Sequence, residues 1–197
     1  MQPIQKSEAL NRLHNKMESF ANIPDDEFEK LKQVMYEKSF KKGEVILRPG
    51  QVCRQYYFIV SGCVRSFSLK DDKEINLSFF FEEDIACDFE SFRSEQPSLV
   101  YLVTTEDCEV LYTNKKEVIP IFSNEEPWHT YLFRFFQHLY LEKDKHAATL
   151  KLLSPEERYN YLITNYPEYF QRVPLIYIAS YLGISRETLN RVRKKLS

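Results

Sequence analysis

The first part of the chain combines two hydrophobic patterns. Residues 7–21 place apolar side chains every three or four positions, and a second run of this kind follows Pro24 with acids in its first turn, so two helices are expected. From residue 40 to residue 113 the pattern changes to short β-branched and aromatic runs broken by turn residues, as in FKKGEVILRPG, YYFIVSGCV and VYLVTTEDCEVLYT. This pattern predicts an antiparallel, all-β domain after the two helices.

Helical spacing returns after Pro127. Apolar residues recur at steps of three and four over some twenty positions and include Leu132, Phe135, Phe136 and Leu139. Such a broad apolar stripe predicts one long helix. The stripe has two candidate partners, the β-domain of its own chain or the same helix of a second copy. Its richness in aromatic residues favours the second copy, and thus a homodimer.

The C-terminal segment predicts two short helices joined by a tight turn. A capping box at Ser154–Glu157 starts the helix that precedes them. Within RVPLIYIASYLGISRETLNRVRKKL, Ala179 is small enough to let two helices approach, Gly183 supplies the turn, and Ser185 is a good N-cap for the last helix. Together with apolar residues at helical spacing, these features are typical of a helix-turn-helix.

The last predicted helix exposes a polar and basic face. Such a helix fits the major groove of B-DNA, where arginine pairs with guanine and glutamate accepts a hydrogen bond from cytosine. The candidate base-reading residues are Arg186, Glu187, Asn190 and Arg191. The candidates for contact with the DNA backbone are Ser185, Thr188, Arg193, Lys194 and Lys195. The alternative is an ordinary helical hairpin with a solvated basic face.

Charge is distributed unevenly between this segment and the rest of the chain. Residues 172–197 contain six basic side chains and one acidic side chain, a net charge of +5, whereas the whole chain carries −2 and the remaining residues therefore −7. A basic tip on an acidic body favours an anionic polymer such as double-stranded DNA, because the tip attracts phosphates while the body discourages indiscriminate binding. Cations at a helix C-terminus would also suit the helix dipole.

Catalytic and metal-binding chemistry finds little support in the sequence. The four cysteines form no CxxC pair, and the four histidines all lie outside residues 40–113. Clustered metal ligands are therefore not expected, and no P-loop, GxSxG, HExxH or GxGxxG motif occurs. The longest apolar runs fall far short of the roughly 18 residues that a membrane span needs. We expect a cytoplasmic protein that is not an enzyme, holds no metal and is not bound to a membrane.

The combination of a β-domain carrying FKKGEVILRPG and YYFIVSGCV, a long helix and a terminal helix-turn-helix resembles the Crp/Fnr family of bacterial transcription regulators over nearly the whole chain. The segment RVPLIYIASYLGISRETLNRVRKKL is similar to the Bacteroidetes branch. The resemblance implies an α+β fold with three parts: an N-terminal double-stranded β-helix domain (jelly-roll, cNMP-binding-like) with N-terminal helices over residues 1–125, a dimerisation helix over 126–150, and a helix-turn-helix domain over 151–197. Because the sequence stops six residues after Arg191, most of the family's β-wing is expected to be missing.

The resemblance also implies a function for the last helix. The sequence SRETLNR closely resembles the family's recognition-helix sequence SRETVGR, which puts Arg186, Glu187 and Arg191 on base-reading positions and implies a TGTGA-like half-site in a palindromic operator. Asn190 stands where that sequence has glycine. By the same resemblance, the protein is a homodimeric transcription regulator that contacts RNA polymerase. The alternative is a small-molecule sensor or protein-interaction module whose helix-turn-helix does not bind DNA.

In the family, a Gly-Glu pair holds the ribose of a cyclic nucleotide, and an arginine with a small hydroxyl residue holds its phosphate. A gapless alignment puts Cys87 and Asp88 on the first pair, and Ser98 and Leu99 on the second. Without the arginine a buried phosphate has no bidentate partner, so cyclic AMP is not the expected effector, and no cofactor is predicted. The candidate effector pocket comprises Cys87, Asp88, Phe89, Ser98, Leu99 and Tyr101. Its aromatic residues indicate either a more apolar pocket or simply a filled core.

Overall fold

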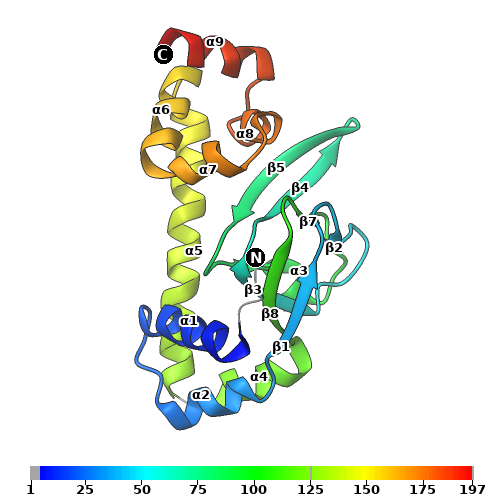
Figure 1. Cartoon of the computed structure of the whole chain (residues 1–197), viewed down its shortest axis with the longest axis vertical. Coiled ribbons are helices and arrows are strands. Elements are labelled where there is room, and N and C mark those ends of the chain that lie inside the picture. The colour runs from blue at the N-terminus through cyan, green and yellow to red at the C-terminus, as the bar shows by residue number, and fades with distance from the viewer. Residues whose placement is uncertain (1–4, 125, 197) are drawn as a thin grey trace. The chain divides into compact units, whose positions relative to one another are not determined.

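A computed structural model describes residues 5–124 and 126–196 of the chain (Figure 1). The chain divides into two compact units. The first, here called the β-roll unit, consists of Met1–Ser66 and Phe79–Gln137, and the second, the C-terminal unit, consists of Phe67–Ser78 and His138–Ser197. Within the described ranges, no helix combines the length and the apolar character that a membrane crossing requires.

Among the residues that the structure describes, the strands form two four-stranded sheets. One has the strand order β1-β8-β3-β6 and the other β2-β7-β4-β5. Their strands are β1 (Tyr36–Phe40), β2 (Val45–Leu47), β3 (Gln55–Ser61), β4 (Val64–Lys70), β5 (Lys73–Phe80), β6 (Ile85–Ala86), β7 (Tyr101–Thr104) and β8 (Cys108–Asn114). The pairs β1–β8, β2–β7, β3–β6 and β3–β8 are all antiparallel. The predicted antiparallel β-domain and the α+β class are thus confirmed.

Strand β3 is the centre of the β-roll unit. Its residues from Tyr56 to Val60 are all buried. Buried and exposed residues do not alternate along it, as is typical of a strand that is covered on both faces. The tight connection from β3 to β4 depends on Gly62, whose φ is +98°. A Cβ at this position would lie 2.5 Å from the carbonyl oxygen of Asp107 and 2.6 Å from Sγ of Cys108. Only glycine therefore fits where β3 turns beside the start of β8.

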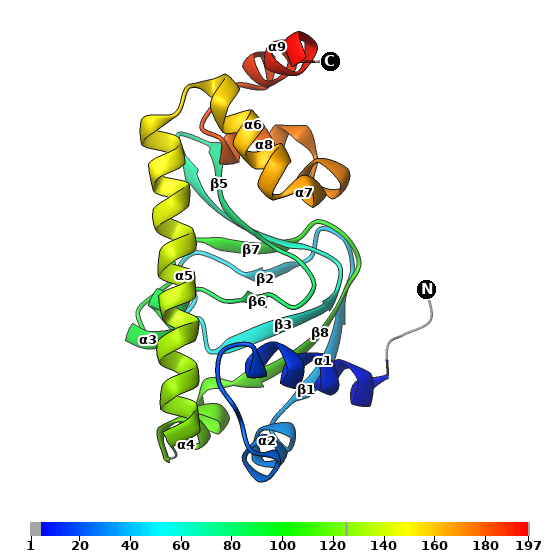
Figure 2. The ribbon, with the colours of Figure 1, turned by 90° about the vertical axis from the view of Figure 1, so that its left-hand side faces the viewer.

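In the β-roll unit, helices precede the strands, interrupt them between β6 and β7, and follow them. They are α1 (Lys6–Glu18), α2 (Asp25–Lys32), α3 (Phe89–Ser94), α4 (Lys115–Asn124) and the first part of α5 (Glu126–Leu152). Helix α1 contacts β3 with its buried face (Figure 2). Trp128, at the start of α5, is fully buried and donates from Nε1 to Oε2 of Glu27, 2.9 Å away. This bond satisfies a buried carboxylate that also pairs with Lys30, and it fixes α5 to α2.

In the described residues of the C-terminal unit, the remainder of α5 is followed by four shorter helices. These are α6 (Pro155–Asn165), α7 (Pro167–Arg172), α8 (Leu175–Tyr181) and α9 (Arg186–Leu196). The predicted capping box of α6 is present: Ser154 accepts from the backbone N–H of Glu157, whose side chain accepts from the backbone N–H of Ser154. Residues 67–78, the outer part of the β4–β5 hairpin, belong to the same unit.

Candidate nucleic-acid interface and candidate effector pocket

Helices α8 and α9 lie in the segment that the sequence predicts to be a helix-turn-helix, and a tight turn joins them. Helix α8 ends in a Schellman motif, in which the N–H of Ile184 donates to the carbonyl of Ala179 (3.0 Å) and the N–H of Gly183 donates to that of Ser180 (3.1 Å). Gly183 has a φ of +65°, the left-handed conformation that this motif needs. Ala179 is buried, as its predicted role at the helix contact requires. The glycine and the small residue thus set the angle at which the chain enters α9.

Helix α9 is amphipathic with a capped start. Ser185 is its N-cap, since Oγ accepts from the backbone N–H of Thr188 at 3.1 Å, as predicted. Leu189 and Val192 are buried, and α9 contacts both α6 and α8. The predicted base-reading and basic residues are all exposed; they are Arg186, Glu187, Asn190, Arg191, Arg193, Lys194 and Lys195. A single 11-residue helix therefore holds an apolar face against its unit and a polar, mainly basic face toward solvent.

Several of the predicted DNA-contacting side chains already have partners in the protein. Nζ of Lys195 lies 2.6 Å from Oε2 of Glu156 on α6. Hydrogen bonds from its own backbone N–H and from Ser185 lower the pKa of the Glu187 carboxyl. Glu187 is therefore an anion at neutral pH, which is the form that accepts a hydrogen bond from cytosine.

Arg158 is a positioning residue that the sequence analysis missed. Its guanidinium donates to three carbonyl oxygens: Nη2 to Leu150 (2.6 Å), Nε to Leu153 (2.9 Å) and Nη1 to Leu182 (3.0 Å). Leu150 lies in the last turn of α5, and Leu153 and Leu182 directly follow the ends of α5 and α8, where helices leave carbonyls without partners. One planar side chain thus joins α5, α6 and the turn before α9. Nothing in the sequence pattern marks an arginine for this role.

Ser180 joins the helix-turn-helix to the β4–β5 hairpin within the same unit. Its Oγ donates to the carbonyl of Glu74 at 2.7 Å and accepts from the backbone N–H of Asn76 at 3.0 Å. Beside it, the ring of Tyr181 stacks on that of His146, with centroids 4.1 Å apart. Burial lowers the pKa of His146 below its ordinary value. These contacts are between residues more than 30 positions apart, which is why sequence periodicity did not reveal them.

The predicted dimer residues of α5 differ in their surroundings. Phe135 is only 8% exposed, because it stacks on Tyr131 and packs edge-on against Phe20 of its own chain. Leu132 and Leu139 are half-buried, and Phe136 is exposed. Phe135 is thus a core residue of its own protomer, contrary to its expected place on a free face. The strongly exposed aromatic residues of α5 are instead Phe133 (70%) and Tyr140 (68%), which the sequence analysis did not select.

The predicted effector residues form local contacts in the β-roll unit. Ser98 is buried, and its Oγ donates to Oδ2 of Asp88 at 2.7 Å. The other carboxylate oxygen of Asp88 accepts from the backbone N–H of Ser91 at 3.3 Å, so Asp88 is the N-cap of α3. Two residues that the alignment placed on opposite parts of a ligand site therefore bond to each other. The carboxylate is used in part to start a helix.

The other four predicted pocket residues do not converge. Cys87 is buried, Tyr101 is half-buried, and Leu99 is 80% exposed, which is incompatible with a place inside a pocket. The ring of Phe89 packs edge-on against Phe135 and Phe136 of α5, with centroids 5.8 and 5.5 Å apart. For Phe89 the filled core, one of the two alternatives, is what the structure contains.

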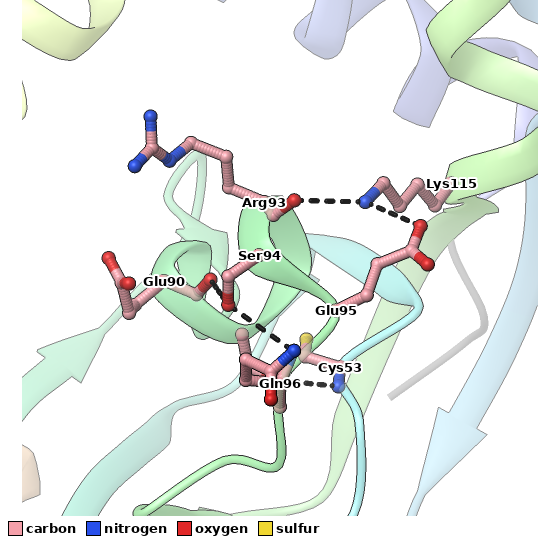
Figure 3. A network of polar contacts seen from close by, with 8 residues as sticks. Cys53, Glu90, Arg93, Ser94, Glu95, Gln96 and Lys115 are labelled. Carbon is pink, nitrogen blue, oxygen red and sulfur yellow. Dashed lines mark hydrogen bonds and ion pairs between the residues drawn. The ribbon is translucent and has the colours of Figure 1, made fainter.

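A cavity of about 410 Å³ lies elsewhere in the β-roll unit. Its lining residues are Ile46, Leu47, Gln51, Val52, Cys53, Arg54, Gln55, Tyr57 and Leu102. None of the six predicted pocket residues is among them, but Cys53 touches Cys87, with the two Sγ atoms 3.8 Å apart. Figure 3 shows Cys53 beside the chain that leaves α3. There the backbone N–H of Cys53 donates to Oγ of Ser91 at 2.9 Å.

Comparison with known proteins agrees with this architecture. Residues 37–125 match the family of cyclic nucleotide-binding domains. Similar solved structures include FixK2 from Bradyrhizobium japonicum (TM-score 0.70, 20% identity, 83% of this chain and 84% of that chain covered). A second is the c-di-GMP-responsive global regulator CLP of Xanthomonas campestris (TM-score 0.67, 22% identity, 88% of this chain and 91% of that chain covered). A third is a protein assigned to the Crp/Fnr transcriptional regulators from Eubacterium rectale (TM-score 0.69, 18% identity, 88% of this chain and 83% of that chain covered).

No curated protein matches the sequence. At identities of 18–22% the similarity to the solved structures establishes the fold. The chain therefore shares the fold of these solved structures, and its residues 37–125 are similar to cyclic nucleotide-binding domains.

Proposed function

We propose that this protein is a homodimeric, sequence-specific DNA-binding transcription regulator of the Crp/Fnr type. Its helix α9 enters the major groove of a palindromic operator, and Arg186, Glu187 and Arg191 read base edges. The β-roll unit holds the site for an effector other than cyclic AMP. The branch of the family, the TGTGA-like half-site, the contact with RNA polymerase and the cytoplasmic location stay predictions from the resemblance.

The observation that carries the proposal is the construction of α9. Its start is capped by Ser185, its entry angle is set by Gly183, and its buried face is fixed by Leu189 and Val192. The side chains left at the exposed N-terminal turns are an arginine and a glutamate, which match guanine and cytosine in the major groove. The C-terminal turns carry lysine and arginine, which suit phosphates. A helix that only covered a core would not need this order of polar groups.

Dimerisation supplies the second half of the operator contact. Phe133 and Phe136, three residues apart on α5, and Tyr140 four residues further, are large apolar side chains at helical spacing, and all three are exposed. A second copy of α5 would cover them. Two α9 helices held about 34 Å apart would then meet successive turns of one side of the duplex. The absence of an arginine beside Ser98 supports an effector without a cyclic phosphate.

The proposal is tested by measuring affinity for a duplex that the protein enriches from random DNA, together with its single-base variants. Arg186→Ala should cost about 1–3 kcal/mol and relax the preference at one base pair of each half-site. Lys194→Ala should weaken binding to all variants alike and lower the salt dependence by about one counterion. Lys116→Ala, an exposed lysine of α4, is the charge-matched control and should change neither property.

Two results would argue against the proposal. If Arg186→Ala and Lys194→Ala both lower affinity uniformly across the variants, α9 does not read bases. If the wild-type protein and the Lys116→Ala control both bind the enriched duplex no more tightly than unrelated DNA, α9 does not recognise a sequence. The alternative of a DNA-silent sensor or protein-interaction module then replaces the proposal.

A further inference from the structure

Two cysteine thiols touch inside the β-roll unit. Sγ of Cys53 and Sγ of Cys87 are 3.8 Å apart, and both cysteines are buried and free of disulfides. A disulfide has an S–S distance of about 2.05 Å, so the two atoms must approach by a little under roughly 2 Å. Side-chain rotations with a small backbone adjustment cover such a distance. The geometry already brings together two groups that are 34 positions apart in the sequence.

We propose that Cys53 and Cys87 are a modification site, at which a peroxide converts the two thiols into a reversible disulfide. Cys53 is the thiol that the oxidant reaches, because it lines the cavity of about 410 Å³ whereas Cys87 does not. A cavity needs only about 10–15 Å³ to hold a water molecule, and hydrogen peroxide is a little larger. The cavity therefore brings the oxidant to one sulfur of the pair and leaves the other sulfur protected behind it.

The surroundings of the two thiols give them different roles. The hydrogen bond from Cys87 lowers the pKa of the Cys53 thiol, and the backbone N–H of Asp88 acts in the same direction. Burial raises the pKa of Cys87 well above its ordinary value. The thiolate is the reactive form of cysteine. Cys53 thus becomes the attacking sulfur, and Cys87 keeps its proton until the second step.

The chemistry balances with one hydrogen peroxide for each disulfide. The thiolate of Cys53 attacks one oxygen, the O–O bond breaks, and a sulfenic acid forms while the leaving hydroxide takes up a proton as water. Sγ of Cys87 then attacks the sulfenic sulfur, the S–O bond breaks, and a second water leaves with the proton of Cys87. Two sulfur atoms have lost one electron each, and the peroxide has gained both. A dithiol such as dithiothreitol reverses the reaction by exchange.

The other two cysteines provide an internal comparison. Cys63 and Cys108 are also buried, but Sγ of Cys108 donates to the carbonyl of Cys63 at 3.4 Å. Neither of these two cysteines lines the cavity. They are therefore expected to stay reduced while Cys53 and Cys87 react, since susceptibility follows access and thiolate character.

The disulfide would tie the cavity wall to the start of α3. Cys87 directly precedes Asp88, the N-cap of that helix, and Phe89 packs on Phe135 and Phe136 of α5. Oxidation at the cavity is thereby linked to the helix proposed for dimerisation. That consequence rests on the proposed function, so the test reads the thiols directly and is independent of DNA binding.

The experiment treats the reduced full-length protein with hydrogen peroxide under native conditions at neutral pH, blocks the remaining thiols after denaturation, and maps non-reduced peptides by mass spectrometry. The expected product loses two of its four thiols, contains a peptide pair joining Cys53 to Cys87 within one chain, and returns to four thiols with dithiothreitol. Disulfides joining other cysteines, only intermolecular bonds, or four thiols left intact would overturn the proposal. The map of the unmutated chain decides this even where a variant fails to fold.

Three variants separate the roles of the two sulfurs. Cys87→Ser should stop at the sulfenic acid of Cys53, which dimedone traps. Cys53→Ser should keep its three remaining thiols under the same treatment, and the matched control Cys63→Ser should still lose two. If Cys53→Ser is oxidised as fast as the unmutated chain, the assignment of Cys53 as the attacking sulfur is wrong.

Discussion

Two regions of the molecule contain the functional residues that the sequence predicts, α9 and the segment from Cys87 to Tyr101. The structure agrees with the predicted positions in the first region much better than in the second. In α9 the selected polar residues are exposed, apart from the half-buried Thr188, and the apolar residues between them are buried. In the second segment, Leu99 is exposed, Ser98 is bonded to Asp88, and Phe89 packs on α5. The face of a helix follows from a local period, whereas a hollow in a β-roll depends on strand pairs that are distant in sequence.

This difference should be visible in the response to one added methyl group. Gly62→Ala in the β-roll unit should lower the free energy of unfolding by on the order of 3 kcal/mol, because its Cβ would overlap backbone atoms and its φ is positive. Gly183→Ala in the C-terminal unit should cost only about 1 kcal/mol, the cost of the left-handed conformation, since the nearest atom to its Cβ is Nη1 of Arg158 at 3.4 Å and no backbone atom overlaps it. Urea unfolding of each variant measures both values. Equal costs would contradict the account.

Arg158 is one of the long-range contacts that hold α8 and α9 in place, and its removal should loosen the position of α9. Arg158→Ala leaves three carbonyl oxygens without their donor, and we expect a loss of about 2 kcal/mol and faster amide exchange in α8 and α9. Lys151→Ala, an exposed change at the end of α5, is the control and should leave exchange unchanged. Exchange that stays slow in Arg158→Ala would show that local helix packing alone positions α9.

On α9, Lys195 forms an ion pair with Glu156, and this pair should make its contribution to DNA binding smaller than that of the neighbouring Lys194. Lys195 must leave Glu156 to contact a phosphate, and an exposed pair of this kind is worth about 0–1 kcal/mol. Lys195→Ala should therefore weaken DNA binding less than Lys194→Ala, and Glu156→Ala should strengthen it slightly. Titrations of a fixed duplex at one salt concentration compare the three variants. A larger loss for Lys195→Ala than for Lys194→Ala would refute the competition between Glu156 and DNA.

The smallest expected effect is a pH dependence confined to the C-terminal unit. Burial lowers the pKa of His146 in the folded protein, so below its ordinary pKa of about 6.5 the unfolded chain binds more protons than the folded chain. The contribution of neutral His146 to the free energy of unfolding is complete above about pH 6.5, and it is lost as the pH falls through the lowered pKa of His146 in the folded protein. His146→Phe, which keeps a ring against Tyr181, should flatten this dependence.

The measurement is the protection of the α8 amides from hydrogen exchange, relative to an unfolded chain at the same pH, at pH values on either side of about 6.5. His129→Phe, at an exposed position of α5 in the β-roll unit, should not change it. A pH dependence that survives in His146→Phe would assign it to another group.

The sequence predicts correctly those elements that depend on residues close together along the chain. The strands between residues 40 and 113, the long helix after Pro127, the capping box at Ser154 and the N-cap at Ser185 all follow from local patterns. It missed α3, whose six residues include two phenylalanines that look like part of a strand. The helix forms there because Asp88 caps it, which depends on the turn before it rather than on any period.

The parts that could not be predicted are contacts across the chain. Arg158 bonds to the carbonyl of Leu182, 24 residues away, and Ser180 bonds to backbone groups of Glu74 and Asn76 more than 100 residues away. The cavity lined by Cys53 arises between segments that a gapless alignment does not compare. Such features require the register of strands and the packing of helices, and neither is fixed by the residue types alone.

The central claim, that α9 reads DNA as part of a dimer, is tested most directly by selection of bound duplexes from a random library at fixed, near-physiological salt. The account predicts enrichment of an inverted repeat whose half-site centres are about one helical turn apart, and the loss of one base preference in Arg186→Ala. Failure to enrich any sequence, repeated at low salt and on both the reduced and the oxidised protein, would contradict it.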